Sequence, residues 1–226
     1  MKSDRHTLVV IPAYNAASYL PELLKRLASV HPLERCLVID DGSSDNTAQI
    51  LGDANVNFIH FRENRGKGAA LRAGFGWARD NGFTSVVTID ADLQHCPEEI
   101  PALIEAHFAT GSAVTIGSRF PGAPAMPWPR QISNCLTSLV LSLCARRRIR
   151  DCQCGFRALN LSHLPHRKLR ESGFMFESEL LFTLSATDAP IGEAPISAVY
   201  SAQRSYIHPL RDSARFLRLL WRRFWY

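Results

Sequence analysis

The first half of the chain alternates short apolar runs with segments whose apolar residues recur at helical spacing. Runs rich in β-branched and other apolar residues predict buried strands over residues 7–11, 36–39, 56–61, 86–89 and 113–117. Helices are predicted over 19–27, over the alanine-rich segment 69–79, and from the proline-led acidic turn 97–99. Strands that alternate with helices in this way predict a doubly wound, mostly parallel α/β sheet.

The pattern changes after residue 120. Prolines at positions 121, 124, 127 and 129 predict an irregular loop. Residues 132–145 are almost all apolar and are flanked by Arg130 and by the arginines of 146–150. A span of about 14 residues is too short to cross a bilayer, which needs roughly 20. This segment therefore predicts either a core helix or a helix that lies in the membrane interface.

The C-terminal residues 215–226 mix arginine with tryptophan and other aromatic residues. Basic helices of this composition bind anionic membrane surfaces. We therefore expect a main domain over 1–209 and a basic aromatic helix over 210–226 that contacts the membrane. A terminal helix packed on the domain, or an interface with a protein partner, is the alternative.

Length and composition agree with one globular domain. The chain has 226 residues, of which 46% are hydrophobic and 21% charged, enough to bury a sizeable core. The net charge of +5 favours anionic partners such as nucleotides or phospholipid, and no nucleic-acid-binding module is visible, so we expect no nucleic acid. The six cysteines form no disulfide framework, and Cys152-x-Cys154 is too tightly spaced for zinc. No secretory signal precedes the first strand, so we expect a cytoplasmic location.

Two of the predicted strands end in pairs of carboxylates. Asp40 and Asp41 follow the second strand, while Asp90 and Asp92 follow the fourth. Because the carboxyl ends of parallel strands meet at one edge of a sheet, we expect these carboxylates to lie together where a ligand binds. Gln94 offers a further oxygen, and such ligands suit Mg²⁺ or Mn²⁺ that also binds substrate phosphates. The alternative is a solvated acidic loop.

The residues after Asp41 are typical of a turn that leads into a helix. Gly42 is expected to take a positive φ. Ser43 or Ser44 is expected to cap the helix that follows.

Five segments in sequence order carry a family resemblance. They are Val9-Val10-Ile11-Pro12-Ala13-Tyr14-Asn15, Val38-Ile39-Asp40-Asp41-Gly42-Ser43-Ser44-Asp45, Asn64-Arg65-Gly66-Lys67-Gly68, Asp90-Ala91-Asp92-Leu93-Gln94-His95-Cys96-Pro97 and Asp151-Cys152-Gln153-Cys154-Gly155-Phe156-Arg157. Together they resemble the inverting family-two glycosyltransferases with a GT-A fold, and most closely the dolichyl- or polyprenyl-phosphate mannose and glucose synthases.

The resemblance implies roles for particular positions. The nucleotide sugar would be bound by Pro12, Tyr14, Asn15, Ile39, Asp41, Lys67, Asp90, Ala91, Asp92, Arg119 and Arg204. The metal, Mg²⁺ or Mn²⁺, would be held by Asp90, Asp92 and Gln94, and the catalytic residues would be Asp90, Asp92, Arg119 and Asp151. Arg130, with Ser133 or Asn134, is a weaker candidate for an acceptor phosphate. Alternatively, Lys67 is a solvated surface charge, and Pro12 and Gly42 only shape turns.

The implied activity is transfer of a sugar from GDP-mannose or a UDP-sugar to a lipid-linked acceptor, a polyprenyl phosphate, on the cytoplasmic face of an anionic membrane. A lipid phosphate needs no strong general base, whereas a hydroxyl acceptor needs a carboxylate. Glu177 and Glu179 are the candidates for that base, or else form a charged helix face. A non-catalytic nucleotide-binding subunit is the alternative outside enzymes. Ala16 stands where the synthases usually carry Glu, and residues 205–211 replace their Gly-x-Ser-Lys segment, so donor and acceptor stay open.

Overall fold

The computed structural model describes residues 6–119, 128–145, 147–164, 169–171, 173, 175–185, 187 and 189–197. The predictions for the loop at 121–127, for Arg204 and for the C-terminal helix over 210–226 lie outside these residues. The same is true of the side chains of Arg130 and Ser133.

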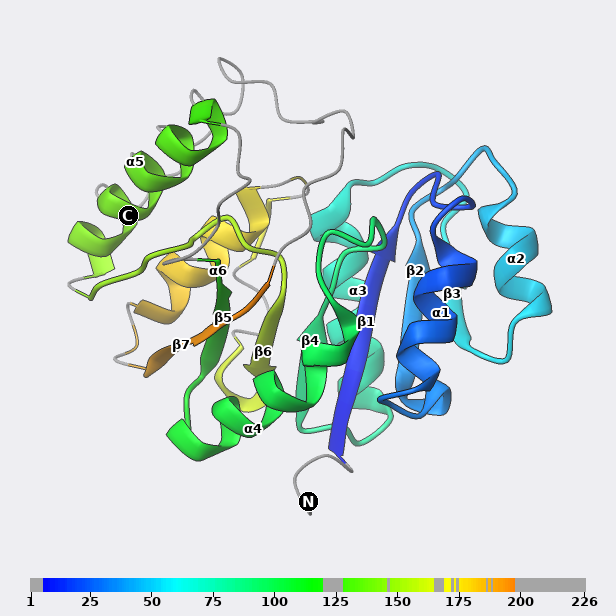
Figure 1. Ribbon diagram of the computed structural model, residues 1–226, viewed down its shortest axis with the longest axis horizontal. Helices are drawn as coiled ribbons and strands as arrows, with labels where there is room; N and C mark the ends of the chain where they lie inside the picture. The colour runs from blue at the N-terminus through cyan, green and yellow to red at the C-terminus, as the bar shows by residue number, and fades with distance from the viewer. Residues whose placement is uncertain are drawn as a thin grey trace.

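The chain folds into a mixed α/β domain (Figure 1). Its elements are β1 (Thr7–Ala13), α1 (Leu20–Ala28), η2 (Leu33–Arg35), β2 (Cys36–Asp40), α2 (Thr47–Asp53), β3 (Asn57–His60), α3 (Lys67–Asp80), β4 (Ser85–Thr88), η3 (Pro97–Glu99), α4 (Ile100–Thr110), β5 (Val114–Ser118), α5 (Trp128–Ala145), β6 (Arg157–Asn160), η4 (Leu161–His163), α6 (Met175–Ser185) and β7 (Ile191–Pro195). Each strand and helix predicted up to residue 118 is present, with ends that differ by at most three residues.

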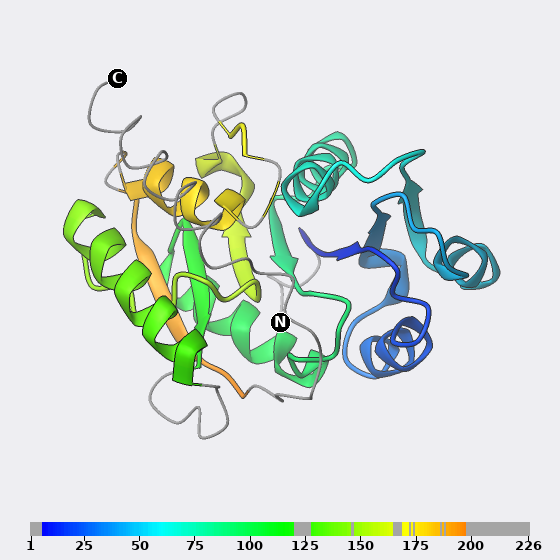
Figure 2. The same ribbon diagram turned by 90° about the horizontal axis from the view of Figure 1, so that it is seen from above.

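The seven strands form one sheet in the order β3-β2-β1-β4-β6-β5-β7. β1 pairs in parallel with both β2 and β4, while β6 runs antiparallel between β4 and β5. Figure 2 shows α3 and α6 on one face of the sheet, α1 and α4 on the other, and α5 at its outer margin beside α6. The predicted mostly parallel sheet is therefore confirmed, with one antiparallel strand that the sequence pattern did not indicate.

The core lies around the central strands, and every residue of β2, β4 and β5 is buried. For β2, this is expected of a parallel strand covered on both faces. α1 packs one apolar face against the sheet through Leu20, Leu23, Leu24 and Leu27. Its Pro21 sits in the first turn, where the missing N–H costs no hydrogen bond.

The turn after β2 differs from the prediction in one respect. Gly42 has the expected φ of +70°, and a Cβ there would lie 2.4 Å from the backbone carbon of Glu63. The N-cap of α2, however, is Asn46, and the first helical residue, Thr47, donates hydrogen bonds from its backbone N–H and its hydroxyl to Asp45 Oδ1. The prediction that Ser43 or Ser44 caps this helix is wrong, because both serines bond to Asn15 on the neighbouring loop.

The apolar segment after residue 130 forms α5, which is only half buried. α5 begins at Trp128, so the prediction that Pro129 belongs to the irregular loop is wrong. Leu141 on its inner face is fully buried, while Leu136 and Leu143 are exposed. Among the described residues, no helix is both long enough and apolar enough to cross a membrane.

Candidate active site

The acidic strand ends meet at one edge of the sheet, as expected. β1 lies between β2 and β4 and is parallel to both, so the residues that follow β2 and β4 emerge on the same side. Asp40 and Asp41 therefore share this edge with Asp90 and Asp92.

Asp40 and Asp41 fasten the loops of this edge. Asp40 accepts a hydrogen bond from the backbone N–H of Ser43 at 3.0 Å and contacts His60 Nδ1 at 2.8 Å. Asp41 accepts hydrogen bonds from the backbone N–H groups of Arg65 at 2.7 Å and Gly66 at 2.8 Å. Burial raises the pKa of the Asp41 carboxyl, although the two N–H groups oppose this. Asp41 thus holds the start of α3, which carries Lys67.

The loop after β1 is held against the loop after β2 by Asn15. This residue has a φ of +51°, its N–H donates to Ser43 Oγ at 2.8 Å, and its Oδ1 accepts from the N–H of Ser44 at 2.9 Å. Tyr14 beside it is 46% exposed, so its ring is accessible to a ligand. Ile39 is fully buried, which leaves only its backbone to face a nucleotide.

Lys67 joins two carboxylates from different parts of the fold. Its Nζ lies 2.6 Å from Asp90 Oδ1 and 2.7 Å from Glu177 Oε1 on α6. Burial alone would lower the pKa of Lys67, but the two carboxylates overcome this and raise it. Burial alone would likewise raise the pKa of Asp90, yet the charge of Lys67 keeps it below the ordinary value. The alternative that Lys67 is a solvated surface charge is wrong, since only 16% of its side chain is exposed.

The two glutamates of α6 are both buried, so the charged helix face considered for them is wrong. Glu177 pairs with Lys67, whereas Glu179 accepts hydrogen bonds from the backbone N–H groups of Arg170 and Glu171. Glu179 therefore anchors the segment before α6, and only Glu177 belongs to the polar cluster at the sheet edge.

Asp92 provides the second carboxylate after β4. Its pKa is raised by burial and by the negative charge of Asp90, and its Oδ1 accepts a hydrogen bond from the N–H of Gln94 at 3.1 Å. Leu93 between them has a φ of +59°, an uncommon conformation for a residue with a branched side chain. The neighbouring structure thus holds this turn in place.

A divalent cation fits this pair of carboxylates. Burial is the main cause of the raised pKa of Asp92 and the charge of Asp90 adds to it, and a hard cation bound to both carboxylates would offset both effects. Within the part of the chain that the structure describes, no group of three or more His, Cys, Asp or Glu side chains could hold a metal. Asp90 and Asp92 would therefore supply two ligands, with phosphate oxygens of a substrate completing the shell, as is usual for Mg²⁺.

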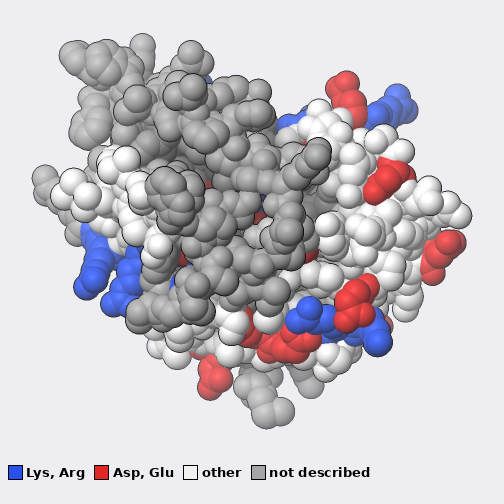
Figure 3. Space-filling model, turned by 45° about the horizontal axis from the view of Figure 1, so that its top comes forward, with Lys and Arg blue, Asp and Glu red and all other residues white. Residues whose placement is uncertain are grey.

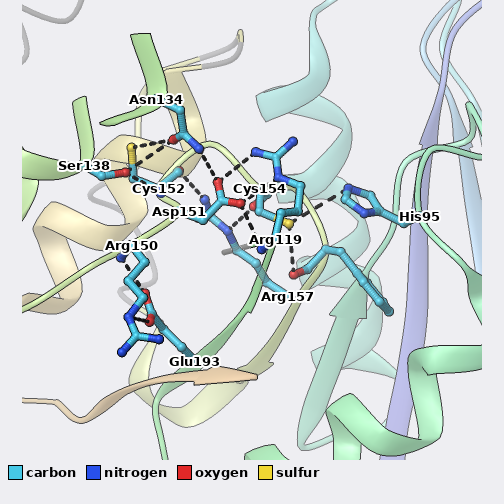
Figure 4. A network of polar contacts seen from close by, with 11 residues as sticks. His95, Arg119, Asn134, Ser138, Arg150, Asp151, Cys152, Cys154, Arg157 and Glu193 are labelled. Carbon is cyan, nitrogen blue, oxygen red and sulfur yellow. Dashed lines mark hydrogen bonds and ion pairs between the residues drawn. The ribbon is translucent and has the colours of Figure 1, made fainter. Parts of the chain in front are cut away.

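Asp151 lies at the centre of a second polar network (Figure 4). Its carboxylate accepts hydrogen bonds from Arg119 Nε at 2.6 Å, Arg119 Nη2 at 2.7 Å and the Arg119 backbone N–H at 3.3 Å, and one from Asn134 Nδ2 at 2.8 Å. Burial would raise the pKa of Asp151, but Arg119 and Asn134 hold it below the ordinary value. Asn134 is buried, and its side chain is bonded to Asp151. The contact of Asn134 with an acceptor phosphate stays a prediction.

The loop that carries Asp151 is shaped by Arg157, a residue to which the sequence assigned no role. This arginine is 1% exposed and donates hydrogen bonds to the carbonyl oxygens of Cys152, Cys154 and Glu177. Gly155 in the same loop approaches Asp90 so closely that a Cβ would lie 2.8 Å from Asp90 Oδ2. In the sequence, the one signal for Gly155 and Arg157 was that both lie in residues 151–157, a segment that carries the family resemblance.

His95 lies between the two networks. Its Nε2 is 3.9 Å from Cys154 Sγ, and its Nδ1 has no hydrogen-bond partner among the described residues. Burial lowers the pKa of His95 to about 4, and the charges of Asp90, Arg119, Lys67 and Asp151 all act on it. These four charged groups therefore converge around one buried imidazole, which is neutral at physiological pH.

Comparisons with known proteins agree with this geometry. Residues 8–160 match the model of a protein family described as glycosyl transferase family 2. The chain is 31% identical over 213 residues to polyprenol monophosphomannose synthase of Mycolicibacterium smegmatis, covering 87% of this chain and 78% of that one. It is 31% identical over 202 residues to undecaprenyl-phosphate mannosyltransferase of Micrococcus luteus, with coverage of 85% and 83%.

A similar fold occurs in a crystal structure of glucosyl-3-phosphoglycerate synthase from Mycobacterium tuberculosis in complex with Mn²⁺, uridine diphosphate and phosphoglyceric acid. The TM-score is 0.76 at 19% sequence identity, over 96% of this chain and 78% of that one. At this identity the likeness concerns the fold.

Proposed function

The chain belongs to glycosyl transferase family 2 and is a glycosyltransferase with a GT-A fold, and we propose that it transfers a hexose, with inversion, from a nucleoside-diphosphate sugar to a polyprenyl phosphate. GDP-mannose or a UDP-sugar is the proposed donor. The names of the two bacterial relatives support a lipid-linked acceptor and, in both, a mannosyl group.

One observation carries the proposal: negative and positive groups are arranged side by side at the carboxyl edge of the sheet. Asp90 and Asp92 provide the negative part, while Arg119, held by Asp151, provides the positive part. A sugar diphosphate with a divalent cation has the matching arrangement, since the cation faces carboxylates and phosphate oxygens face a guanidinium.

The residues of the site have distinct tasks in this reaction. Breaking the bond between sugar and diphosphate leaves extra negative charge on the departing nucleotide. Mg²⁺ or Mn²⁺ bound to Asp90 and Asp92, with Gln94 nearby, would supply positive charge there. Arg119 stabilises the same charge, because Asp151 already fixes its guanidinium and little reorganisation is needed. Lys67 fixes Asp90 in position, and Tyr14, exposed beside Pro12, is the proposed contact for the base.

The acceptor determines whether a general base is needed. A polyprenyl phosphate is an anion and attacks without losing a proton, which suits a site where Glu177 is paired with Lys67. A second candidate function, transfer to a hydroxyl, is favoured by the burial of Glu177 so near Asp90, because a buried carboxylate there could accept the proton. The proposed location is the anionic cytoplasmic surface of a membrane, where Arg130 and Arg204 would meet phosphate groups.

A screen of donors tests the proposal. Purified protein is incubated with GDP-mannose or UDP-sugars, with Mn²⁺ or Mg²⁺, and with undecaprenyl phosphate in detergent, and the lipid is examined by mass spectrometry. We expect one hexose to be added to the lipid phosphate and the reaction to stop when EDTA is added. Unchanged lipid with every donor, from protein that binds nucleotide, would overturn the proposal in favour of a non-catalytic subunit.

The variant Glu177→Gln separates the two acceptor classes. For a phosphate acceptor, the variant loosens Lys67 and Asp90, so metal affinity falls while the rate at saturating metal changes less than about tenfold. For a hydroxyl acceptor it removes the base, so the rate at saturating metal falls by about 10² to 10⁴. Glu179→Gln, which alters a loop anchor on the same helix, is the matched control.

A further inference from the structure

Helix α5 turns a row of polar side chains towards the loop that carries Asp151. Asn134, Ser138 and Ser142 recur every fourth residue, so they lie on one face of the helix. Asn134 is 1% exposed and Ser138 is 3% exposed. Polar side chains buried in this way are expected to have specific hydrogen-bond partners. We call these three residues the α5 polar row.

The backbone beside Asp151 is fixed on both sides. On one side, Ser138 Oγ accepts a hydrogen bond from the N–H of Cys152 at 3.0 Å. On the other, Glu193 of β7 accepts a hydrogen bond from the N–H of Arg150, which is exposed. Figure 3 shows basic side chains at the left margin of the molecule, where Figure 1 places the C-terminal end of α5. The loop therefore has its anchors before the carboxylate itself is considered.

Asn134 binds the carboxylate rather than the backbone. Its Nδ2 donates to Asp151 Oδ1 at 2.8 Å, and the same oxygen accepts a hydrogen bond from Arg119 Nη2 at 2.7 Å (Figure 4). The amide of Asn134 is oriented in turn by Ser138, whose hydroxyl donates to Asn134 Oδ1 at 3.3 Å. A carboxylate bound by a guanidinium alone can rotate together with it, whereas a donor from a second element fixes both groups.

Exposure differs among the three side chains of this chain of contacts. Asn134 is 1% exposed and Asp151 is fully buried, while 12% of the Arg119 side chain is exposed. Arg119 is therefore the member of the three that is open to a ligand. Asn134 is in a position to act on that ligand through Asp151 and Arg119.

We propose that Asn134 is a positioning residue for sugar transfer, which acts through Asp151 to hold the guanidinium of Arg119 in the orientation that binds the departing diphosphate. This inference rests on the proposed function, in which Arg119 stabilises the charge that forms when the sugar leaves. Because that charge is larger in the transition state than in the bound donor, a misoriented guanidinium lowers kcat more than it lowers donor affinity.

Steady-state kinetics of Asn134→Leu test the assignment. The variant keeps a side chain of similar size without a hydrogen-bond donor, and we expect kcat to fall about 10- to 100-fold while the KM values for donor and lipid each change less than about threefold. Ser142→Ala removes a hydrogen bond from the same polar row to the backbone of Ile149, and this matched control is expected to keep the kcat of the parent. Thermal unfolding checks that both variants fold. A raised KM for the lipid with kcat unchanged overturns the proposal in favour of direct contact with the acceptor phosphate.

Asn134→Asp provides a readout that a purely structural role would not change. At about pH 8 the introduced carboxylate repels Asp151 and disturbs its pair with Arg119. At about pH 5.5 a proton shared by the two carboxyl groups supplies an O–H donor in place of the amide N–H. We expect the rate relative to the parent at the same pH to rise at least about tenfold between these values, and to stay constant for Asn134→Leu. A constant ratio for Asn134→Asp overturns the proposal, and this nearly isosteric variant keeps the test available if Asn134→Leu does not fold.

A double-mutant cycle separates this inference from the proposed activity. The affinity for GDP or UDP with Mn²⁺ is measured by calorimetry for the parent, Asn134→Leu, Arg119→Ala and the combined variant. We expect Asn134→Leu to weaken binding about five- to tenfold in the parent and less than about twofold in Arg119→Ala, since its effect passes through Arg119. Equal losses in the two backgrounds overturn the proposal. The expected coupling in a protein that transfers no sugar contradicts the proposed function and leaves the positioning role supported.

Discussion

The two halves of the sheet hold their loops in different ways. In the half formed by β1 to β3, carboxylates and amides bind backbone groups, as Asp41 does with Arg65 and Gly66. In the half formed by β5 to β7, Arg157 also binds backbone groups, but a buried ion pair between Asp151 and Arg119 is added to these contacts. The first arrangement fixes the backbone of the loops through neutral N–H groups. The second builds a permanent cation into the site.

The two halves meet at the end of β4. Asp90 is bound by Lys67 from α3, which also reaches Glu177 of α6, and Gly155 of the second half packs against this pair. We therefore expect the base and ribose of the nucleotide to contact the first half, the metal to lie at the boundary beside Asp90 and Asp92, and Arg119 of the second half to position the charged phosphate. Substitutions in the two halves should therefore differ in how far they reduce turnover, stability and donor binding.

The largest expected effect is on turnover. Asp92→Asn removes one of the two carboxylates proposed to hold the metal, and we expect the rate of sugar transfer to fall about 10³-fold with the fold intact. Asp53→Asn, an exposed carboxylate on α2, is expected to have no effect. Initial rates across a Mn²⁺ titration provide the measurement. A variant as fast as the parent would remove the reason for assigning the metal to the end of β4.

The next effect is on stability and tests the buried ion pair of the second half. Asp151→Asn leaves the charge of Arg119 without its carboxylate, so we expect the free energy of unfolding to fall by about 4 kcal/mol. Glu98→Gln removes a carboxylate that binds Arg26 in the same two-bond geometry at the surface, where we expect a loss below about 1 kcal/mol. Urea denaturation measures both. Equal losses would show that burial of the pair is unimportant.

The pH dependence of the free energy of unfolding tests a buried histidine beside β5. His107 on α4 is buried against Thr115 of β5, and burial lowers its pKa from 6.5 to about 4. Between pH 6.5 and pH 4, His107 binds a proton in the unfolded chain but not in the folded chain. The contribution of His107 to the free energy of unfolding is therefore complete above pH 6.5 and is lost as the pH falls towards 4. The expected loss is roughly 2 to 3 kcal/mol, and His107→Gln should reduce the slope. Identical slopes for parent and variant would contradict this assignment.

The smallest effect is expected in the first half. Asn15→Ala removes the contacts with Ser44 from a residue with positive φ, so we expect about 1 to 2 kcal/mol of destabilisation and a raised KM for the donor. Asn15→Gly keeps the backbone conformation available and isolates the loss of hydrogen bonds. Thermal unfolding and donor kinetics are measured together. An unchanged KM in Asn15→Ala would indicate that this contact between loops does not organise the nucleotide site.

Local patterns in the chain were sufficient to predict strands β1 to β5. The run 36–39 predicted β2 because a strand covered on both faces must be apolar throughout, and Asp90 and Asp92 were expected at a shared edge because parallel strands align their ends. β6 and β7 were not predicted. Arg157 and Asn160 end a four-residue strand, and Gly192 and Pro195 lie in the other, so neither has the apolar alternation of a strand.

Sequence by itself therefore determined the order of strands and helices up to residue 118, the acidic strand ends and the family resemblance. Tertiary structure alone decided which charges pair. Lys67 could be a surface lysine or a buried one until α3 and α6 were packed together, and Glu177 could face water or Lys67. The physical reason is that strand and helix formation depend on neighbours along the chain, whereas the pairing of Lys67 with Glu177 depends on segments 110 residues apart that meet only in the fold.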